Sequence, residues 1–262
     1  MKIIVCVKQV PDTNEVRIDK KTGTLIRDGV PSILNNDDAN ALEEALRIKD
    51  ADPNVHITLV TMGPPQAEEV LLEGLAMGAD EAILLSDRVF AGSDTWATSN
   101  CISAAIRKIG DYDIIFAGRQ AIDGDTAQVG PQIAEKLDIP QVTYVQEFSR
   151  EGDKIIVKRA LEDGYEMIET QTPCLLTAIK ELNEPRYMSV SGIFNSTKKG
   201  ITVWNAADLG ITKEVCGLEA SPTNVHRSFT PEPKGKGKMI EGDSAADTAA
   251  ALVSELKINH II

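Results

Sequence analysis

The sequence predicts an α/β protein with a doubly wound, mainly parallel sheet, an antiparallel β insertion and a C-terminal arm. Short apolar runs alternate with helix-like segments over residues 2–137, a pattern typical of a parallel sheet covered by helices on both faces. The alternation then stops, and residues 141–179 contain only strand-like runs. We therefore expect one α/β domain over residues 1–229, with the insertion at about 141–179, followed by a linker and helical arm over 230–262.

Apolar, β-branched runs mark the first four strands of the expected sheet. These runs are "KIIVCV" (2–7), "HITLVTM" (56–62), "EAILLS" (81–86) and "DIIFAG" (113–118). The helices between and after them have apolar residues at helical spacing. They are "NNDDANALEEALRIKD" (35–50), "PQAEEVLLEGLAMGA" (65–79), "DTWATSNCISAAIRKIG" (94–110) and "GPQIAEKL" (130–137). A strand order of 3-2-1-4-5 would place the first and fourth strands on either side of the point where ligands bind doubly wound sheets.

Three further segments are predicted from their turns and periodicity. Alternating residues around Thr22-Gly23 indicate a small hairpin over 16–28. The insertion contains four strand-like runs, with turns at Gly152-Asp153 and Asp163-Gly164, and its last run, "CLLTAIK" (174–180), is expected to return to the main sheet. From Met188 onward we expect irregular chain, then the linker "TPEPKGKGK" (230–238) and an amphipathic helix, "SAADTAAALVSELK", capped by Asp243 or Ser244.

The composition excludes several classes of protein. A net charge of −13 and an aromatic content of 4% argue against a nucleic-acid or anionic-membrane surface. No apolar run approaches the roughly 20 residues of a membrane span, and no signal peptide is expected. The four cysteines have no CxxC spacing and the three histidines are far apart, so we expect a cytoplasmic protein without a metal site.

The loop after the fourth strand is the candidate ligand site. Gly118 and Gly124 allow close approach of the backbone, and Asp123 and Asp125 can accept hydrogen bonds from ribose hydroxyls. Together with the start of the following helix, this chemistry suits a nucleotide. The alternative is a solvated connection that caps a helix, because neither a GxGxxG nor a P-loop pattern is present.

Several motifs together resemble the electron-transfer flavoprotein beta subunit family. They are "VCVKQVPDT" (5–13), "AMGAD" (76–80), "GRQAIDGDTAQVG" (118–130), "VKRALEDGYEMIETQTPCLLTA" (157–178) and "LNEPRYMSV" (182–190). The resemblance implies an adenine-nucleotide alpha-hydrolase-like fold and a heterodimer with an alpha subunit that carries FAD.

The resemblance also implies a set of nucleotide-contacting residues. These are Cys6, Asn35, Asn36, Asp37, Asp38, Met62, Gly118, Arg119, Gln120, Ala121, Ile122, Asp123, Gly124, Asp125, Thr126, Ala127, Gln128 and Val129. Structural alternatives stay open for some of them: Cys6 and Met62 can simply pack in the core, and Asn35 can cap a helix. No catalytic acid or nucleophile is expected.

The nucleotide can be AMP or a second FAD. The segment "SDRVFAGSDTWATSN" (86–100) resembles the electron-bifurcating, FAD-binding branch of the family, and its hydroxyls and helix N-terminus suit a pyrophosphate. The residues concerned are Ser93, Asp94, Thr95, Thr98 and Ser99. Gly124, where many AMP-type relatives have Asp, also favours FAD. The alternatives are an ordinary helix cap with structural AMP and, from a different class, a nucleotide-sensing module of the universal-stress type.

The bifurcating branch implies a set of partners. NADH would be the electron donor, and the acceptors would be ferredoxin or flavodoxin and an acyl-CoA dehydrogenase or similar flavoenzyme. In the partner segment we expect Val190 to be the apolar docking anchor, with Arg186 and Tyr187 supporting it. The C-terminal arm is expected to contact the alpha subunit.

Overall fold

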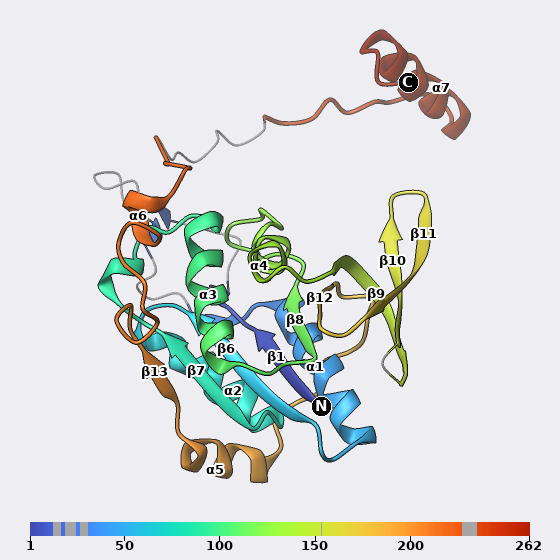
Figure 1. Ribbon diagram of the computed structural model, residues 1–262. Helices are drawn as coiled ribbons and strands as arrows, with labels where there is room; N and C mark the ends of the chain where they lie inside the picture. Colours follow the sequence, from blue (N-terminus) through green and yellow to red (C-terminus); the bar gives the residue numbers. More distant parts are fainter. Residues whose placement is uncertain (13–16, 19–24, 27–30, 153, 227–234) are drawn as a thin grey trace. The chain divides into compact units, whose positions relative to one another are not determined.

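The computed structural model describes residues 1–12, 17–18, 25–26, 31–152, 154–226 and 235–262. The chain divides into two compact units: residues 1–17 with 25–226, and residues 18–24 with 227–262 (Figure 1). The first unit contains all the candidate ligand residues, and the second contains the C-terminal helix.

A nine-stranded sheet runs through the first unit in the order β11-β10-β9-β12-β8-β1-β6-β7-β13 (Figure 1). Its strands are β1 (Lys2–Cys6), β6 (His56–Met62), β7 (Glu81–Leu85), β8 (Ile114–Gly118), β9 (Gln141–Glu151), β10 (Lys154–Leu161), β11 (Gly164–Gln171), β12 (Cys174–Ala178) and β13 (Thr202–Trp204). The central order β7-β6-β1-β8-β12 is the expected 3-2-1-4-5, and each of these strands runs parallel to its neighbours. The predicted fold class is therefore confirmed.

The insertion forms one end of the sheet. β10 pairs antiparallel with both β9 and β11, whereas β9 runs parallel to β12. Gly152 and Gly164, at the two predicted turns, have positive φ angles of 63° and 159°, the first of which favours glycine. Asp153 lies outside the described residues. As expected, β12 returns to the main sheet beside β8.

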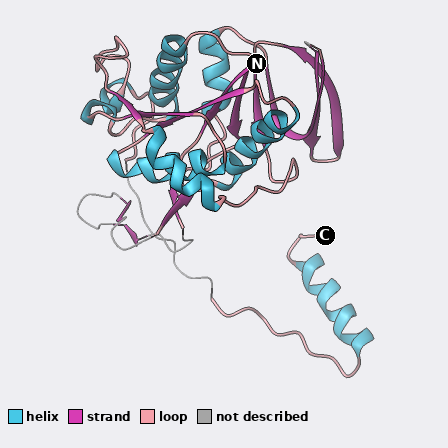
Figure 2. Ribbon diagram, turned by 90° about the horizontal axis from the view of Figure 1, so that it is seen from below, coloured by secondary structure: helices cyan, strands magenta, loops and turns pink. Residues whose placement is uncertain are grey.

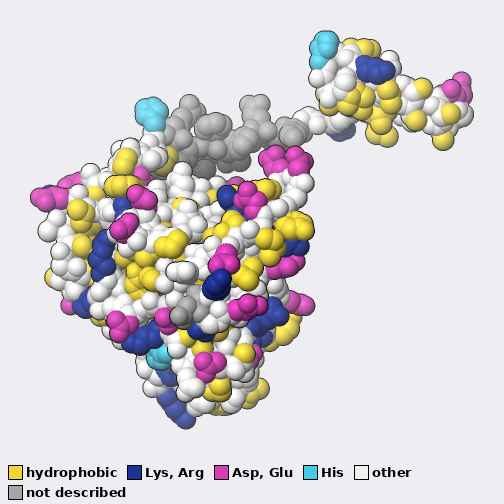
Figure 3. Space-filling model, turned by 45° about the vertical axis from the view of Figure 1, so that its right-hand side comes forward, with side chains coloured by type: hydrophobic (Ala, Val, Ile, Leu, Met, Phe, Trp, Pro, Cys, Tyr) yellow, Lys and Arg dark blue, Asp and Glu magenta, His cyan; other side chains and the backbone are white. Residues whose placement is uncertain are grey.

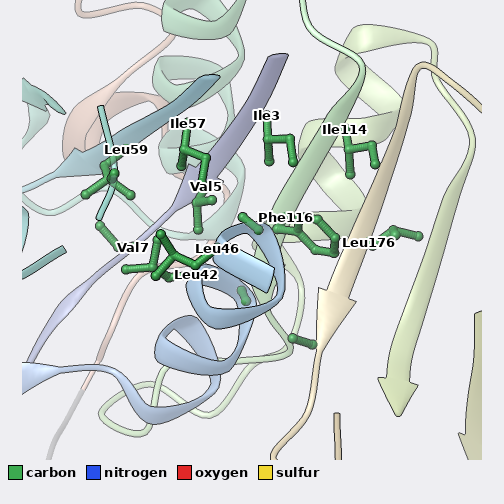
Figure 4. Close-up of a cluster of buried hydrophobic side chains, with 14 of the residues drawn as sticks. Ile3, Val5, Val7, Leu42, Leu46, Ile57, Leu59, Ile114, Phe116 and Leu176 are labelled. Atoms are coloured by element: carbon green, nitrogen blue, oxygen red, sulfur yellow. The ribbon is translucent and has the colours of Figure 1, made fainter. Parts of the chain in front are cut away.

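Helices cover both faces of the sheet (Figure 2). They are α1 (Asn36–Ala51), the short 3₁₀ turn η1 (Pro65–Ala67) with α2 (Glu68–Met77), the turn η2 (Arg88–Phe90), α3 (Thr95–Ile109) and α4 (Val129–Leu137). α1 and α2 pack on one face, where Leu42 and Leu46 lie against Val5, Ile57 and Phe116 (Figure 4). The helices α3 and α4 bury a second apolar cluster on the opposite face. This arrangement follows from strands that are apolar on both faces.

The expectation of irregular chain from Met188 is wrong. Helix α5 (Val190–Lys199) follows directly, then β13 and the one-turn helix α6 (Gly217–Ala220). Ser189 caps α5, because its Oγ accepts a hydrogen bond from Gly192 N at 2.9 Å. The helix was missed because it is only ten residues long and contains Gly192 and the β-branched residues Val190 and Ile193, which have low helix propensity.

Two small ribbons complete the first part of the chain. β2 (Gln9–Pro11) pairs antiparallel with β5 (Ser32–Leu34). β3 (Arg17–Ile18) and β4 (Leu25–Ile26) form a two-stranded sheet, as the hairpin prediction required, while the turn at Thr22-Gly23 lies outside the described residues. In the described part of the chain, no helix is long and apolar enough to cross a membrane, and no cluster of metal-ligating side chains is found.

The second unit is built around helix α7 (Ala245–Ile258). Ser244 is its N-cap, accepting a hydrogen bond from Asp247 N at 3.2 Å, so one of the two predicted caps is confirmed. None of its residues is buried, and Val253 and Ile258 are exposed. Hydrophobic side chains are visible on the surface of this helix in Figure 3. A helix of this length is marginal in water without packing partners.

Candidate functional site

Asp38 connects the two strands on either side of the expected ligand point. It lies in the first turn of α1 and is 7% exposed. Its Oδ1 accepts a hydrogen bond from Gly118 N at 2.9 Å, and its Oδ2 accepts one from Lys8 N at 2.8 Å. Gly118 ends β8 and Lys8 follows β1, so one carboxylate fixes both strand ends. This contact gives Asp38 a structural role in building the site.

Burial raises the pKa of Asp38 to about 7, against an ordinary value of 3.8, although hydrogen bonds from Asn35, Gly118 and Lys8 lower it. Between about pH 4 and 7 the folded state therefore retains a proton that the unfolded chain has released. Asp38 should accordingly contribute most to the free energy of unfolding at low pH, and its contribution should fall as the pH rises to 7.

We expect the difference in the free energy of unfolding between the wild type and Asp38→Asn to shrink from pH 5 to pH 7 and then to remain constant. Guanidinium unfolding of the purified proteins at several pH values measures this difference. A difference that grows over the same range would show that the folded carboxyl has a lowered pKa.

Asn35 anchors the loop that follows β8. The residue is fully buried, its Nδ2 donates to Gln120 O at 2.9 Å, and its Oδ1 accepts from Ile122 N at 3.1 Å. Asn35 occupies the N-cap position of α1, but its side chain makes no capping hydrogen bond there. The alternative that the Asn35 side chain caps the helix is therefore wrong. The side chain forms hydrogen bonds with backbone groups of the loop.

The loop itself has an unusual backbone. Asp125 and Ala127 have positive φ angles of 54° and 53°, in the left-handed region that non-glycine residues rarely adopt. Gln120 donates a hydrogen bond to Asp125, and Lys8 Nζ donates to Asp123 Oδ1 at 2.7 Å. Strained backbone that the surroundings hold in place is common at ligand sites. The loop is therefore organised by its own contacts and by Asn35, as a ligand loop requires.

Arg119 lies at the entrance of the loop beside Asp37. Its Nε is 3.3 Å from Asp37 Oδ2, close enough for an ion pair but not aligned for a hydrogen bond. Its guanidinium lies 5.8 Å from the centre of the Tyr144 ring. Burial raises the pKa of Asp37, with Arg119 opposing that effect. Arg119 is thus engaged with protein groups on two sides.

Two helix N-termini meet at the same edge of the sheet. Thr95, the first residue of α3, donates from Oγ1 to Gln128 Oε1 at 2.9 Å, and Gln128 directly precedes α4. Gln132 Nε2 also contacts Thr95 Oγ1, at 3.4 Å, while the buried Gln132 Oε1 has no partner among the described residues. Helix N-termini attract anions through their free amides and dipoles. Their convergence here suits a phosphate or pyrophosphate.

Other polar residues of the 86–100 segment already have internal partners. Ser93 Oγ bonds to Phe90 O and Gly217 N, Asp94 caps α3 through Ala97 N and also accepts from Thr223 N, and Ser99 Oγ bonds to Trp96 O. Thr98 is half-buried. The helix-cap alternative therefore describes Asp94 well, and of this group Thr95 is the residue whose side chain reaches the loop.

Cys6 and Met62 lie at the ends of β1 and β6. Cys6 is 8% exposed, Met62 is partly buried, and both belong to the apolar cluster under α3 and α4. Burial raises the pKa of the Cys6 thiol to about 12, so the thiol is neutral and unreactive. Both residues serve as apolar packing at the floor of the sheet edge.

Comparison with known proteins identifies the family. The electron transfer flavoprotein domain matches residues 22–209. An electron transfer flavoprotein subunit beta from Clostridium acetobutylicum is 59% identical over 262 residues, covering 100% of both chains. The chain belongs to the electron transfer flavoprotein family.

Other members of the electron transfer flavoprotein family also match the chain along its whole length. The caffeyl-CoA reductase-Etf complex subunit CarD of Acetobacterium woodii is 62% identical over 262 residues, covering 100% of both chains. The acryloyl-CoA reductase electron transfer subunit gamma of Anaerotignum propionicum is 51% identical over 269 residues, again covering 100% of both. The sequence resemblance to the beta subunits of this family is thus confirmed.

The segment expected to contact partners, residues 182–190, leads into α5. Arg186 forms paired hydrogen bonds with Glu43, at 2.8 and 2.9 Å, and a further bond of 2.7 Å to Asp50. These bonds tie the segment to α1. Tyr187 has almost no packing contact, because it is 96% exposed. Val190 is 74% exposed at the first helical position, which keeps it available as an anchor.

Sequence reasoning missed three residues that contact the candidate site. Lys8 contributes through both its backbone amide and its side chain, and its position directly after the first strand was the available signal. Gln132, on α4, and Tyr144, in a bulge of β9 with a φ of 57°, had no sequence signal. Their roles arise from packing between elements that are distant in the sequence.

Proposed function

We propose that this chain is the FAD-binding beta subunit of a heterodimeric electron-transfer flavoprotein that bifurcates electrons. The single observation that carries the proposal is the convergence of the N-termini of α3 and α4 at the ligand edge, joined by the bond between Thr95 and Gln128. The N-terminus of α4 has no side-chain cap, so its amides can receive one phosphate, and the Thr95 hydroxyl at the start of α3 can receive a second. This pair matches a pyrophosphate better than the single phosphate of AMP.

The residues present fit the diphosphate part of FAD. The Gln132 Nε2 amide and the Thr95 hydroxyl, 3.4 Å apart, are groups that can donate hydrogen bonds to phosphate oxygens. Gly124 leaves open space, since a Cβ built on it would meet no atom within 4 Å. When bound, FAD would supply hydride and single-electron chemistry. The chain's own residues would bind its phosphates, hold the loop in one conformation and exclude water from the edge of the sheet.

The partners follow from the family and from the names of relatives. An alpha subunit carrying FAD would complete the heterodimer. NADH would be the donor, ferredoxin or flavodoxin would receive one electron, and an acyl-CoA dehydrogenase or similar flavoenzyme would receive the other. Relatives named as a caffeyl-CoA reductase-Etf complex subunit and an acryloyl-CoA reductase electron transfer subunit support the last assignment. We place this reaction in the cytoplasm.

Replacing Gly124 by Asp tests the position of the phosphates. We expect Gly124→Asp to weaken FAD binding at the beta site about tenfold or more, because a carboxylate a few ångströms from a phosphate costs on the order of 1–4 kcal/mol. Flavin released from the heterodimer during dialysis measures the effect. Gly124→Ala is the matched control: with open space around Gly124, it should retain its flavin. Equal retention by both variants would place the phosphates elsewhere.

The alternative function is a plain carrier with structural AMP. It is favoured by one observation: Ser93, Asp94 and Ser99 already have internal hydrogen bonds, so most of the 86–100 segment does not need a ligand. The universal-stress alternative has less support, because that class explains neither the β9–β11 insertion nor the family match.

We propose that the C-terminal arm packs against the alpha subunit. Helix α7 has no buried residue, and its apolar side chains need a partner surface. We expect truncation after Thr230 to leave the nucleotide domain folded and to weaken the heterodimer at least tenfold. Analytical ultracentrifugation of the truncated chain mixed with its partner measures the affinity, and circular dichroism provides the control for folding. An undiminished affinity would mean that α7 does not contribute to the interface.

A further inference from the structure

The carboxylate of Glu43 holds the segment that leads into α5. Glu43 lies in the first half of α1 and is 5% exposed. It accepts three hydrogen bonds from Arg186: from Nε at 2.8 Å, from Nη2 at 2.9 Å and from the backbone N at 3.0 Å. Paired bonds between a guanidinium and a carboxylate are directional as well as strong. Glu43 therefore fixes both the side chain and the backbone of Arg186.

Two asparagines make a second connection between α1 and the same segment. Asn40 Nδ2 donates to Asn183 O at 2.7 Å, and Asn183 Nδ2 donates to Asn40 O at 3.0 Å. Asn183 Nδ2 also donates to Glu44 Oε2 at 2.9 Å. Both Asn40 and Glu44 are buried. Residues 183–186 are thus bound to one helix at their first and last positions.

The chain that follows this bound stretch presents exposed apolar side chains. Val190 comes four residues after Arg186 and is 74% exposed, and Tyr187 is 96% exposed. An exposed anchor on a freely moving loop loses conformational entropy when a partner binds it, whereas an anchor held in its bound orientation loses less. The bonds from α1 therefore supply the preorganisation that Val190 cannot obtain from its own packing.

The helix that holds the segment also builds the ligand edge. Asp38, in the first turn of α1, accepts hydrogen bonds from Gly118 N and Lys8 N. Glu43 follows five residues later, about 8 Å further along the axis of the same helix. One rigid element therefore sets the position of the segment relative to the ligand edge.

We propose that Glu43 is a positioning residue for docking of the flavoenzyme that receives electrons: through Arg186 it holds the segment before Val190 in the orientation that the flavoenzyme binds. The inference rests on the proposed function, because that function supplies the partner. Loss of the Glu43 charge would leave Arg186 with Asp50, whose side chain is 62% exposed, as its ion-pair partner. Exposed ion pairs hold a side chain weakly, so the segment would loosen while Asp38 still held the ligand edge.

The test uses the full heterodimer and a purified acyl-CoA dehydrogenase, whose rate of reduction is measured over a range of dehydrogenase concentrations. Glu43→Gln removes the charge with little change in size. Asp111→Asn is the matched control, because it removes the same charge from an exposed ion pair with Lys2, at the end of β1 opposite the ligand edge. Hydrogen exchange of the same proteins reports the order of residues 182–190. The FAD content of every preparation is counted.

We expect Glu43→Gln to raise the dehydrogenase concentration at half-maximal rate at least tenfold, and Asp111→Asn to leave it unchanged. The maximal rate and the FAD content should stay at wild-type values, because the change weakens binding and not the transfer itself. The amides of residues 182–190 should exchange faster, with the central strands unaffected. An unchanged half-maximal concentration, or a loss of maximal rate and FAD together, would overturn the positioning role.

A double variant separates positioning from a direct effect of the charge. In Val190→Ala the anchor is missing, so adding Glu43→Gln should raise the half-maximal concentration less than twofold further. A further rise as large as that in the wild-type background would overturn the inference, because Glu43 would then act independently of the anchor. A wild-type heterodimer that cannot reduce the dehydrogenase would overturn the proposed function, while hydrogen exchange in Glu43→Gln would still decide whether Glu43 fixes the segment.

Discussion

Gly118→Ala is expected to abolish nucleotide binding and to lower the free energy of unfolding by about 3 kcal/mol. A Cβ on Gly118 would lie 2.3 Å from Asp38 Oδ1, 2.7 Å from Asp38 N and 2.8 Å from Asp37 C. Two of these three atoms belong to the backbone of α1 and cannot move aside by a rotamer change. The methyl group therefore has to push β8 away from the first turn of α1.

This displacement of β8 would affect both the Asp38 hydrogen bonds and the loop that follows β8. Asp38 would lose its hydrogen bond to Gly118 N, which is 2.9 Å long, and the loop that starts at Gly118 would change direction. A buried carboxylate with a missing partner is costly. Guanidinium unfolding and the nucleotide content of the purified protein measure the two effects. Gly124→Ala, in the same loop but in open space, is the control and should behave as the wild type.

A Gly118→Ala protein with wild-type stability and nucleotide content would mean that α1 and β8 can separate without cost. That result would remove the role assigned to Asp38 as the connection between the two strand ends.

Gly192→Ala is expected to reduce electron delivery to the dehydrogenase at least tenfold while leaving the bound nucleotide unchanged. The helices α2 and α5 pack closely at this residue, where a Cβ would lie 2.0 Å from Ala76 O and 2.8 Å from Ser189 Oγ. Ala76 O is a backbone atom near the end of α2, so α5 has to move. The first turn of α5 carries Val190, and the same movement would break the Ser189 cap.

Two measurements separate this local effect from a general loss of stability. Hydrogen exchange should show faster exchange of the α5 amides with little change in the central strands. The rate of dehydrogenase reduction at low dehydrogenase concentration should fall. Asn195→Ala, on the exposed side of the same helix, is the control. Undiminished transfer in Gly192→Ala would assign docking to a surface other than α5.

The sequence predicted those parts of the fold that depend on local pattern. Strands such as β6 and the helices after them have strong apolar periodicity, and the order around β1 follows from the right-handed crossovers of parallel strands. Helix α5 was missed because it is short and because Gly192 and its β-branched residues have low helix propensity. Its capping residue, Ser189, was the one local signal present.

The sequence predicted where the candidate site lies in the fold better than it predicted what each side chain does there. The loop from Gly118 to Val129 lies at the edge where the topology places ligands. Asp38 and Asn35, expected as nucleotide contacts, bond to backbone groups of Lys8, Gly118 and the loop. Those partners are between 30 and 87 residues away along the chain, so only the folded structure could show that these side chains build the site.

The most direct test of the proposed function is a count of FAD and AMP released from the purified heterodimer, expressed per dimer. The convergence of the α3 and α4 N-termini at Thr95 and Gln128 leads us to expect two FAD and no AMP. One FAD and one AMP would contradict the account, because the chain would then be a plain carrier whose beta site holds a structural nucleotide.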